Sequence, residues 1–386
     1  MLRVSLSKLF NLSLSREQEV IQSVARTFAR QVVSPQAIQY DLSAQYPQPI
    51  FEEAWKLGLV NAHIPTEFGG TGCQNVVNEL LIEEELSWAC AGIALSINSI
   101  VQLPLVFAGT HDQKKKYLGM LTEAPLQCAF CVTEPGSGSD VAGLTTVAEK
   151  KGDRYILNGQ KMWITNGGIA SWYFVLARSS NREEGFIGLI VDADSVGVTK
   201  GKKEVMMGQR CSNTAGVSFD NVIVPVANVV GRPGDGFKLV MRTFDWSRPS
   251  VAILAVGLAQ RALHESTLFL RESYAAQQNP GDNQSVAFML ADMAANIEAV
   301  RLLSFRAAFE VDNGRRNSHL ASMAKLLAAE TCQKCVSDAV QILGRLGTNA
   351  EHPVEKLYRD AKIFSIYEGT SQIQRLIISR YLMSQP

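Results

Sequence analysis

The stretch "YILNGQKMWITNG", residues Tyr155 to Gly167, decides the fold class, because its short apolar and β-branched runs are separated by Gly and Asn. Runs of this kind are typical of β strands bounded by turns. The runs "SWYFVLA", "EGFIGLIVD" and "GVSFDNVIV" follow it, and all four lie within residues 155–224. Together they predict a compact antiparallel β domain over residues 126–235.

The sequence on both sides of this region has the periodicity of apolar residues that is typical of helices. In "EVIQSVARTFARQVV" and "VVNELLIEEELSWACAGIALSI" the apolar residues recur at three- and four-residue intervals, and "QSVAFMLADMAANIEAVRLLSFRAAFEV" repeats that pattern near the C-terminus. We therefore predict an α+β protein with an N-terminal helical domain (15–125), the middle β domain (126–235) and a C-terminal helical domain (236–386).

The charge balance argues against a nucleic acid or an anionic membrane as the partner. Lys plus Arg equals Asp plus Glu at 37 each, so no net positive field is expected. We found no uninterrupted run of 18 apolar residues, and the longest apolar run is Val251 to Ala259. A soluble protein that binds a small molecule or another protein is expected.

The seven cysteines indicate reduced thiols in a non-secretory compartment. Cys128/Cys131 and Cys332/Cys335 have a spacing that superficially suggests a metal site. Both pairs stand in apolar or small-residue runs and no other ligands are near them in sequence, so we expect core packing and no metal.

The first residues, "MLRVSLSKLFNLSLS", contain Arg3, Lys8 and four serines but no acid. This composition resembles an organellar transit segment, and the leucines could equally form an amphipathic helix docked on the body. We treat 1–14 as a separate segment and expect a mitochondrial location.

Two stretches of the β region have residue types suited to a cofactor. "CVTEPGSGSDVAG" offers hydroxyls and glycine-freed backbone N–H groups that suit a phosphate or the polar edge of a flavin, although such a loop can also be a simple turn. In "KMWITNGG" the side chains of Trp163 and Thr165 fall on one face of a strand, where they could cover a flat ring or simply pack in the core. The glycine spacing and the position within the β region argue against a nicotinamide-binding Rossmann site.

Glu368 lies in the pentad Ile366 to Thr370, just before a predicted helix start. Ser371 and Gln374 have the spacing of a capping box, and apolar residues at helical intervals follow. Glu368 is therefore expected on a turn, either as an ordinary loop acid or as an aimed catalytic carboxylate.

Eight ordered segments now resemble one family. "CVTEPGSGSDVAG", "KMWITNGG", "MGQRCS", "FDWSRP", "AVGLAQRAL", "FMLADMA", "PVEKLYRDAKI" and "IYEGTSQIQRL" are similar in order and spacing to the acyl-CoA dehydrogenase family, and most similar to its mitochondrial medium-chain type. The resemblance covers about 14–382 and implies a helical domain, a β domain and a C-terminal four-helix bundle domain, usually assembled as a homotetramer (a dimer of dimers).

The resemblance implies a flavoenzyme of fatty acid β-oxidation in the mitochondrial matrix. Such an enzyme contains FAD, oxidises a short- to medium-chain fatty acyl-CoA to the trans-2-enoyl-CoA and passes electrons to electron-transfer flavoprotein. Glu368 would be the catalytic base, its backbone N–H would help to stabilise the enolate, and burial beside Tyr367 would raise the pKa of its carboxyl.

The same resemblance assigns the binding residues. Substrate-binding positions are Ser139, Asp245, Arg248, Tyr367 and Gly369. Cofactor-binding positions are Phe130, Val132, Thr133, Gly138, Ser139, Trp163, Ile164, Thr165, Gln284, Gln341, Gly344, Arg345, Thr370 and Gln372.

Four positions depart from the family pattern at the ADP half of the cofactor. Where members have Arg-x-x-Phe-Gly, this chain has Ser273, Ala276 and Gln277, and Arg345 replaces a second glycine. Arg345 or Arg271 could replace the missing charge. The alternatives are a catalytically weak or FAD-poor member that binds acyl-CoA or a protein without turnover, and an acyl-CoA oxidase.

The segment "AGIALSINSIVQLP", Ala91 to Pro104, corresponds to the family segment that lines the acyl pocket. It is two residues shorter than is usual, and Ile97 stands where a small residue is common. The chain-length preference therefore cannot be transferred from the family.

Overall fold

The computed structural model describes residues 13–385 except 74, 98–99 and 276–282. The segment 1–14 lies almost wholly outside the described residues, so both interpretations of it stay predictions. Among the described residues the order is helices, then strands, then helices, and the predicted α+β fold class is confirmed.

The N-terminal domain is built around one helix, α4, whose residues are buried on nearly every side. It packs against α1 and against α9 of the C-terminal domain. The chain enters α1 through a capping box, in which Ser15 accepts a hydrogen bond from the Gln18 N–H at 3.2 Å. The helices are α1 (Arg16–Phe28), a π-helical turn (Ala29–Val33), α2 (Ser34–Ser43), α3 (Gln48–Lys56), α4 (Val76–Ala89), α5 (Ala91–Ile97), α6 (Leu103–Ala108), α7 (His111–Tyr117) and α8 (Gly119–Glu123).

The middle domain is a sheet in the order β1-β4-β2-β3-β7-β6, with β5 on the other edge of β4. Most pairings are antiparallel, as predicted, but β1 and β2 each pair with β4 in parallel, which the alternation of apolar residues does not indicate. The strands are β1 (Cys128–Cys131), β2 (Val147–Lys151), β3 (Arg154–Thr165), β4 (Trp172–Ser179), β5 (Phe186–Asp192), β6 (Val198–Lys203) and β7 (Thr214–Pro225).

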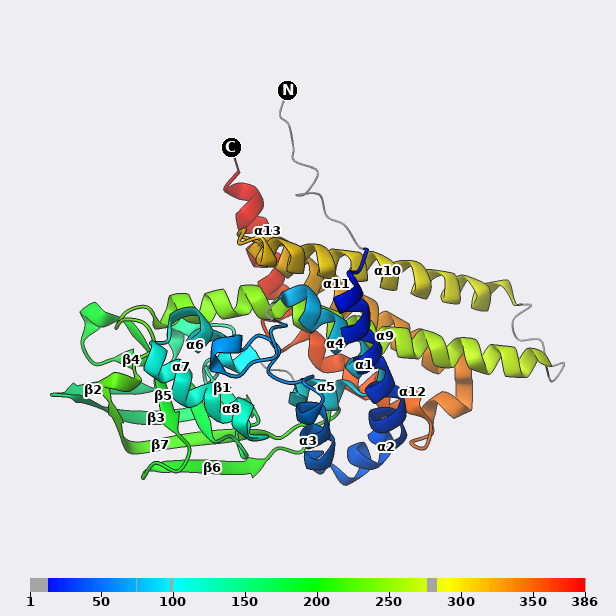
Figure 1. Ribbon diagram of the computed structural model, residues 1–386. Helices are drawn as coiled ribbons and strands as arrows, with labels where there is room; N and C mark the ends of the chain where they lie inside the picture. Colours follow the sequence, from blue (N-terminus) through cyan, green and yellow to red (C-terminus); the bar gives the residue numbers. More distant parts are fainter. Residues whose placement is uncertain (1–12, 74, 98–99, 276–282, 386) are drawn as a thin grey trace.

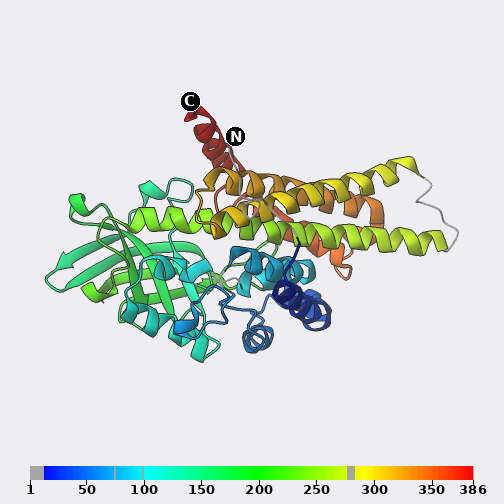
Figure 2. The ribbon, with the colours of Figure 1, turned by 45° about the horizontal axis from the view of Figure 1, so that its top comes forward.

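The C-terminal domain is dominated by α9, a helix of 40 residues. Figures 1 and 2 show α9 running from beside the sheet to the far end of the helical domain, with α10 and α11 alongside it. The helices are α9 (Gly236–Ala275), α10 (Gln284–Asp312), α11 (Ser318–Leu343), α12 (Pro353–Ala361) and α13 (Ser371–Met383).

Three clusters of buried apolar side chains hold these layers together. The largest joins the N-terminal helices to α9, α10 and α11, so the two helical domains share one core. A second fills one face of the sheet, and a third fastens the other face to α6, α7, α8 and the first turns of α9. Because α9 contributes to the first and third clusters, its position is fixed relative to both domains.

One 18-residue window passes the length and composition test for a membrane span, although it is not an uninterrupted apolar run. The window Ala91–Ala108 has a mean hydropathy of 1.7, and 69% of it is buried inside the protein. It is also divided between the separate helices α5 and α6. Burial of that extent is typical of a core segment of a folded domain.

The two Cys-x-x-Cys pairs pack in the interior. Cys128 and Cys131 are buried in β1, and Cys332 and Cys335 are buried in α11. In the part of the chain that the structure describes, no cluster of three His, Cys, Asp or Glu side chains is arranged to hold a metal ion.

Candidate active site

Glu368 lies in the loop between a 3-10 turn (Lys362–Ser365) and α13, as predicted. Its φ is +53°, a left-handed conformation that is uncommon for a residue with a side chain, and Gly369 follows at +89°. Strained backbone of this kind is concentrated at functional sites. The loop therefore holds the Glu368 carboxyl in one fixed direction.

The predicted capping box at Ser371 is wrong. The N-cap of α13 is Thr370, whose hydroxyl accepts a hydrogen bond from the Ile373 N–H at 3.2 Å. Gln374 points back along the loop instead, and its side-chain amide donates to the carbonyls of Gly369 (2.9 Å) and Glu368 (3.2 Å). The loop is consequently fixed from the first turn of the helix that follows it.

Lys325 of α11 fixes the same loop from the other side. Its ammonium group donates to the Gly369 carbonyl at 2.6 Å, and its side chain is almost completely buried. Burial lowers the pKa of Lys325 to about 8, while the charge of Glu368 opposes that change. A buried cation therefore lies beside the carboxylate. Sequence reasoning missed it, because nothing in the local sequence of α11 indicates this contact.

The carboxyl of Glu368 is held by a second buried group. The Ser247 hydroxyl in α9 donates to Glu368 Oε2 at 2.8 Å. Burial raises the pKa of Glu368 above its ordinary value, and the Ser247 hydrogen bond and the charges of Arg248 and Lys325 act in the opposite direction. The arrangement suits a general base, which needs a pKa closer to neutrality than that of a solvated acid.

Arg248, assigned to the substrate by resemblance, is almost fully buried rather than solvated. Its guanidinium pairs with the Asp245 carboxylate at 3.1 Å, one turn earlier in α9. Asp245 also accepts a hydrogen bond from the Ser318 hydroxyl at 2.5 Å, which ties α9 to the start of α11. The structure thus places Arg248 close enough for its charge to act on Glu368, and Asp245 holds Arg248 within a fixed network.

Tyr367 is half-buried and packs against the large helical core. Burial raises its pKa well above the ordinary value, and the Gln209 side chain opposes that shift. Gln209 is itself fixed, since its backbone N–H donates to the Asp360 carboxylate at 2.5 Å. The role of Tyr367 in substrate binding stays a prediction.

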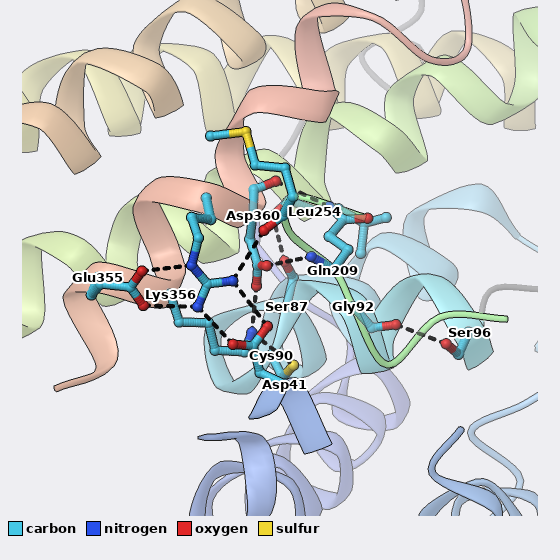
Figure 3. A network of polar contacts seen from close by, with 12 residues as sticks. Asp41, Ser87, Cys90, Gly92, Ser96, Gln209, Leu254, Glu355, Lys356 and Asp360 are labelled. Carbon is cyan, nitrogen blue, oxygen red and sulfur yellow. Dashed lines mark hydrogen bonds and ion pairs between the residues drawn. The ribbon is translucent and has the colours of Figure 1, made fainter. Parts of the chain in front are cut away.

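A polar network around α12 holds the domains together behind this site (Figure 3). Arg359 forms ion pairs with Asp41 of α2 at 2.6 Å and with Glu355 at 2.6 Å. Lys356 pairs with Asp360 and donates to Cys90 Sγ at 3.2 Å. One helix therefore anchors the N-terminal domain and the Gln209 loop.

The predicted flavin residues gather where β1 and β3 meet. Phe130 lies near the end of β1, Val132 and Thr133 directly follow the strand, and the Thr133 carbonyl accepts a hydrogen bond from the Met162 N–H at 2.9 Å. Trp163, Ile164 and Thr165 end β3, where the register shifts between Lys161 and Ile164. Trp163 has a φ of +62° and is 53% exposed. An exposed indole ring beside two strand ends fits a flat cofactor ring.

The loop that bears Gly138 and Ser139 is shaped by a buried acid. The Glu134 carboxylate accepts hydrogen bonds from the Thr145 and Thr146 N–H groups and from Lys161. Although burial opposes its charge, these hydrogen bonds lower the pKa of Glu134 to about 2. A Cβ built on Gly138 would meet nothing within 4 Å, so the loop has open space for a ligand. These features fit the polar part of FAD.

The remaining predicted cofactor residues lie elsewhere. Gln341, Gly344 and Arg345 are exposed at the end of α11, and Gln341 is 16 residues after Lys325, or about 24 Å along the helix. Gln284 is exposed at the start of α10 and Gln372 is exposed in the first turn of α13. Within one chain the structure does not bring the α10 and α11 positions to Glu368.

The departures from the family pattern are only partly visible. Ser273 is buried near the end of α9, and Ala276 and Gln277 lie outside the described residues. Arg271 and Arg345, the two suggested replacements for the missing cation, are both exposed.

Comparison with known proteins agrees with this geometry. Family models match residues 15–124 (acyl-CoA dehydrogenase, N-terminal domain), 129–222 (middle domain) and 234–383 (C-terminal domain). A probable medium-chain specific acyl-CoA dehydrogenase 2 of Caenorhabditis briggsae, described as mitochondrial, is 45% identical over 394 residues, which cover 98% of this chain and 94% of that protein.

Solved structures give the same result. Butyryl-CoA dehydrogenase from Megasphaera elsdenii is 35% identical with a TM-score of 0.93, covering 97% of this chain and 100% of that one. A chain in the structure solved for the electron transferring flavoprotein of Acidaminococcus fermentans is 35% identical with a TM-score of 0.94 and the same coverage. The protein is therefore an FAD-dependent oxidoreductase that belongs to the acyl-CoA dehydrogenase family.

Proposed function

We propose that this enzyme oxidises short- to medium-chain fatty acyl-CoA to trans-2-enoyl-CoA in fatty acid β-oxidation and passes the electrons to electron-transfer flavoprotein. The observation that supports this most directly is the Glu368 carboxyl, held at 2.8 Å by Ser247 with a raised pKa beside the predicted flavin residues. The butyryl-CoA dehydrogenase and medium-chain relatives support the range of chain lengths.

The reaction removes a proton from the α-carbon and a hydride from the β-carbon. Glu368 accepts the α-proton, and the raised pKa makes its carboxylate a stronger base than a solvated glutamate. When bound, FAD supplies the acceptor for the hydride. In the described part of the chain the Glu368 N–H shows no hydrogen-bond partner, so it is available to stabilise the thioester oxygen as negative charge develops.

The residues around the loop hold this arrangement in place. Lys325 and Gln374 fix the carbonyl of Gly369, and Gly369 leaves space for the thioester because it has no Cβ. Arg248 and Lys325 stabilise the ionised form of Glu368, which limits how far burial raises its pKa. The chain thus sets both the direction and the proton affinity of the base.

Two further parts of the proposal rest on the relatives, and a third rests on the positions of the cofactor residues. A mitochondrial matrix location is supported by the Caenorhabditis relative described as mitochondrial. Electron-transfer flavoprotein as the acceptor is supported by the matched chain from the Acidaminococcus structure. The homotetramer is supported by exposed Gln284, Gln341 and Arg345, since cofactor residues so far from Glu368 in one chain could serve a neighbouring subunit.

The visible spectrum of the purified protein tests the proposal. A yellow protein that bleaches on anaerobic addition of a saturated acyl-CoA, and returns to yellow with electron-transfer flavoprotein faster than with air, is expected. Faster recovery in air than with the flavoprotein would identify an oxidase. A yellow protein that no saturated acyl-CoA bleaches would contradict the proposal.

A second candidate is a member that binds acyl-CoA or a protein partner with little FAD and little turnover. Ser273 favours it, because the family has an arginine there and the structure buries the serine. Losing a charge-assisted phosphate contact costs ~1.5–3 kcal/mol, or about one to two powers of ten in affinity. A protein that stays colourless with added FAD would support this candidate, and Ser273→Arg should then raise its FAD content. Equal, tight FAD binding by both proteins would exclude it.

A further inference from the structure

Two buried thiols meet where α4 ends and α5 begins, behind the catalytic loop. Cys90 is the single residue between the two helices, and Cys211 lies in the loop between β6 and β7. Both side chains belong to the interior, with exposures of 0% and 1%. The Cys211 thiol donates a hydrogen bond to Cys90, so the two sulfur atoms are in direct contact.

The first turn of α5 is shaped to bring Cys211 close. A Cβ built on Gly92 would lie 2.8 Å from Cys211 Sγ and 3.0 Å from the Gln209 Cα, and the former distance is shorter than real Cβ atoms allow. Only glycine therefore permits this close approach of the Cys211 loop to α5. The contact between the two thiols depends on the packing of two backbone segments.

A buried cation activates one of the two thiols. Lys356 of α12 donates to Cys90 Sγ at 3.2 Å and also pairs with Asp360 (Figure 3). The Cys211 hydrogen bond and the charge of Lys356 lower the pKa of the Cys90 thiol to about 6, although burial opposes the change. The hydrogen bond to Cys90 and burial raise the pKa of Cys211. At neutral pH a thiolate, which is the nucleophilic form, thus lies against a protonated thiol.

We propose that Cys90 and Cys211 form a site of reversible oxidation, at which hydrogen peroxide converts the two thiols into a disulfide. The Cys90 thiolate attacks one peroxide oxygen and becomes a sulfenic acid, while the O–O bond breaks and the other oxygen leaves as water after taking up a proton. The Cys211 sulfur then attacks the sulfenic sulfur, the S–S bond forms, and the S–O bond breaks with release of a second water. The two thiols lose two electrons, and the peroxide is reduced to two waters.

The chemistry of the pair favours this use over a metal site or a larger oxidant. In the part of the chain that the structure describes, no third His, Cys, Asp or Glu completes a metal site with them, and the Lys356 ammonium would repel a metal ion. Hydrogen peroxide is uncharged and close to water in size, which suits thiols with so little exposure. Disulfides in reducing compartments are usually transient and redox-sensing.

The disulfide would act on the catalytic loop through Gln209. Gln209 is two residues before Cys211, its backbone N–H donates to Asp360, and its side chain is close enough to Tyr367 to act on the pKa of that hydroxyl. An S–S bond of about 2.05 Å requires the Gln209 loop and α5 to move together. Because a shift of about 1 Å near a reacting group can cost ~10²-fold in rate, oxidation should slow flavin reduction at least about tenfold.

The test maps the disulfide in the FAD-loaded protein. The protein is treated with hydrogen peroxide at neutral pH, catalase removes the excess, and free thiols are blocked in denaturant before digestion without a reductant. Mass spectrometry should identify a peptide pair joined through Cys90 and Cys211, two of the seven thiols should be lost, and dithiothreitol should restore both. A protein in which these two cysteines stay reduced, or in which Cys90 passes to a sulfinic acid without a disulfide, would overturn the inference.

Two variants link the disulfide to the rate of flavin bleaching by butyryl-CoA. Cys90→Ser removes the nucleophile, so peroxide should leave Cys211 reduced and the rate unchanged. Cys332→Ser is the matched control, because Cys332 is equally buried but burial raises the pKa of its thiol and no cation acts on it. It should still form the disulfide and lose the rate, reversibly with dithiothreitol. Equal sensitivity of Cys90→Ser and the unmodified protein would overturn the assignment to Cys90.

The outcomes separate this inference from the proposed function, because the disulfide does not depend on the reaction and only its effect on the rate does. If the disulfide forms but no acyl-CoA bleaches the flavin even before oxidation, the oxidation site stands and the proposed function fails. If acyl-CoAs bleach the flavin and the disulfide never forms, only the inference fails. A disulfide with an unchanged bleaching rate would overturn the link through Gln209. Mapping on the unmodified protein decides the matter even if a variant does not fold.

Discussion

The Ser247 hydroxyl donates a 2.8 Å hydrogen bond to Glu368 Oε2 across 121 positions of sequence. This contact joins the long helix α9 to the loop before α13, and it links the proton affinity of the base to the packing of two separate elements. Four predictions follow from it and from its neighbours.

Glu368→Gln should abolish most of the activity while preserving the site. The amide has nearly the same shape but cannot accept the α-proton, and a positioned general base contributes typically about 10²–10⁴-fold. Stopped-flow measurement of anaerobic flavin bleaching by butyryl-CoA checks this, with the flavin absorbance per protein as the control for cofactor retention. Bleaching at the original rate would show that another group takes the proton.

Ser247→Ala should shift the pH dependence of flavin reduction. Glu368 must be ionised to act, so the rate rises with pH through its pKa, which burial already raises. The Ser247 hydrogen bond lowers that pKa, so its removal should move the rising limb of the kcat/KM profile to higher pH.

A matched control exists for Ser247 in the same helix. Ser266 is equally buried, but its hydroxyl donates to the Ala262 carbonyl of its own helix at 2.8 Å. Ser266→Ala should leave the rising limb of the kcat/KM pH profile where it is. A rising limb that shifts equally in both variants, or in neither, would refute the role given to Ser247.

Lys325→Met should lower the rate of flavin reduction and move the rising limb of the kcat/KM profile to higher pH. The substitution removes the cation that stabilises ionised Glu368 and a 2.6 Å hydrogen bond to the Gly369 carbonyl. A hydrogen bond to a charged group is worth about 1.5–3 kcal/mol, so a loss of at least about tenfold in rate is expected.

Lys334 serves as the control for Lys325, because it lies in the same helix but is exposed and paired with Asp338. Lys334→Met should change neither the rate nor the pH profile, since exposed ion pairs contribute at most about 1 kcal/mol. A normal pH profile for Lys325→Met would show that its role is structural only.

Gly369→Ala should disturb the loop more than an ordinary glycine substitution. Gly369 has a φ of +89°, and an added Cβ would lie 2.6 Å from the Gln374 side-chain nitrogen. Left-handed strain alone costs about 1–2 kcal/mol, and displacing Gln374 adds to it. Gly314→Ala is the comparison, since its φ is +66° but a Cβ there meets nothing within 4 Å. The free energy of unfolding should fall further for Gly369→Ala, and equal losses would contradict the clash.

The sequence predicted the fold well because the periodicity of apolar residues changes sharply at the domain borders. The α, β, α order and the turn at Glu368 depend on local patterns of this kind. The parallel pairings of β4 were not predictable in the same way, because strands that are distant in sequence form them and alternation does not encode the partner. The misplaced helix cap at Ser371 shows a similar limit, since Thr370 fits the same position.

The candidate site was predictable only in part. Glu368 has a recognisable local motif, but the contacts that set its pKa come from Ser247 and Lys325, 121 and 43 positions away. The burial of Glu79 and Glu83 in α4 was equally unpredictable, because in a helix rich in glutamate two buried acids look like solvated ones. Burial depends on how helices pack, and composition does not reveal it.

The 40-residue helix α9 restricts the insertions and deletions that this protein can tolerate. Because Ser247, which donates to Glu368, and Ser250, which donates to Glu83, are three residues apart on one side of a single continuous helix, inserting or deleting one residue before them would rotate both by about 100° together. Length changes upstream in α9 are therefore excluded, whereas single substitutions can retune one partner at a time. Diversification of substrate range in this chain is expected to proceed through point changes along that side, with the spacing kept constant.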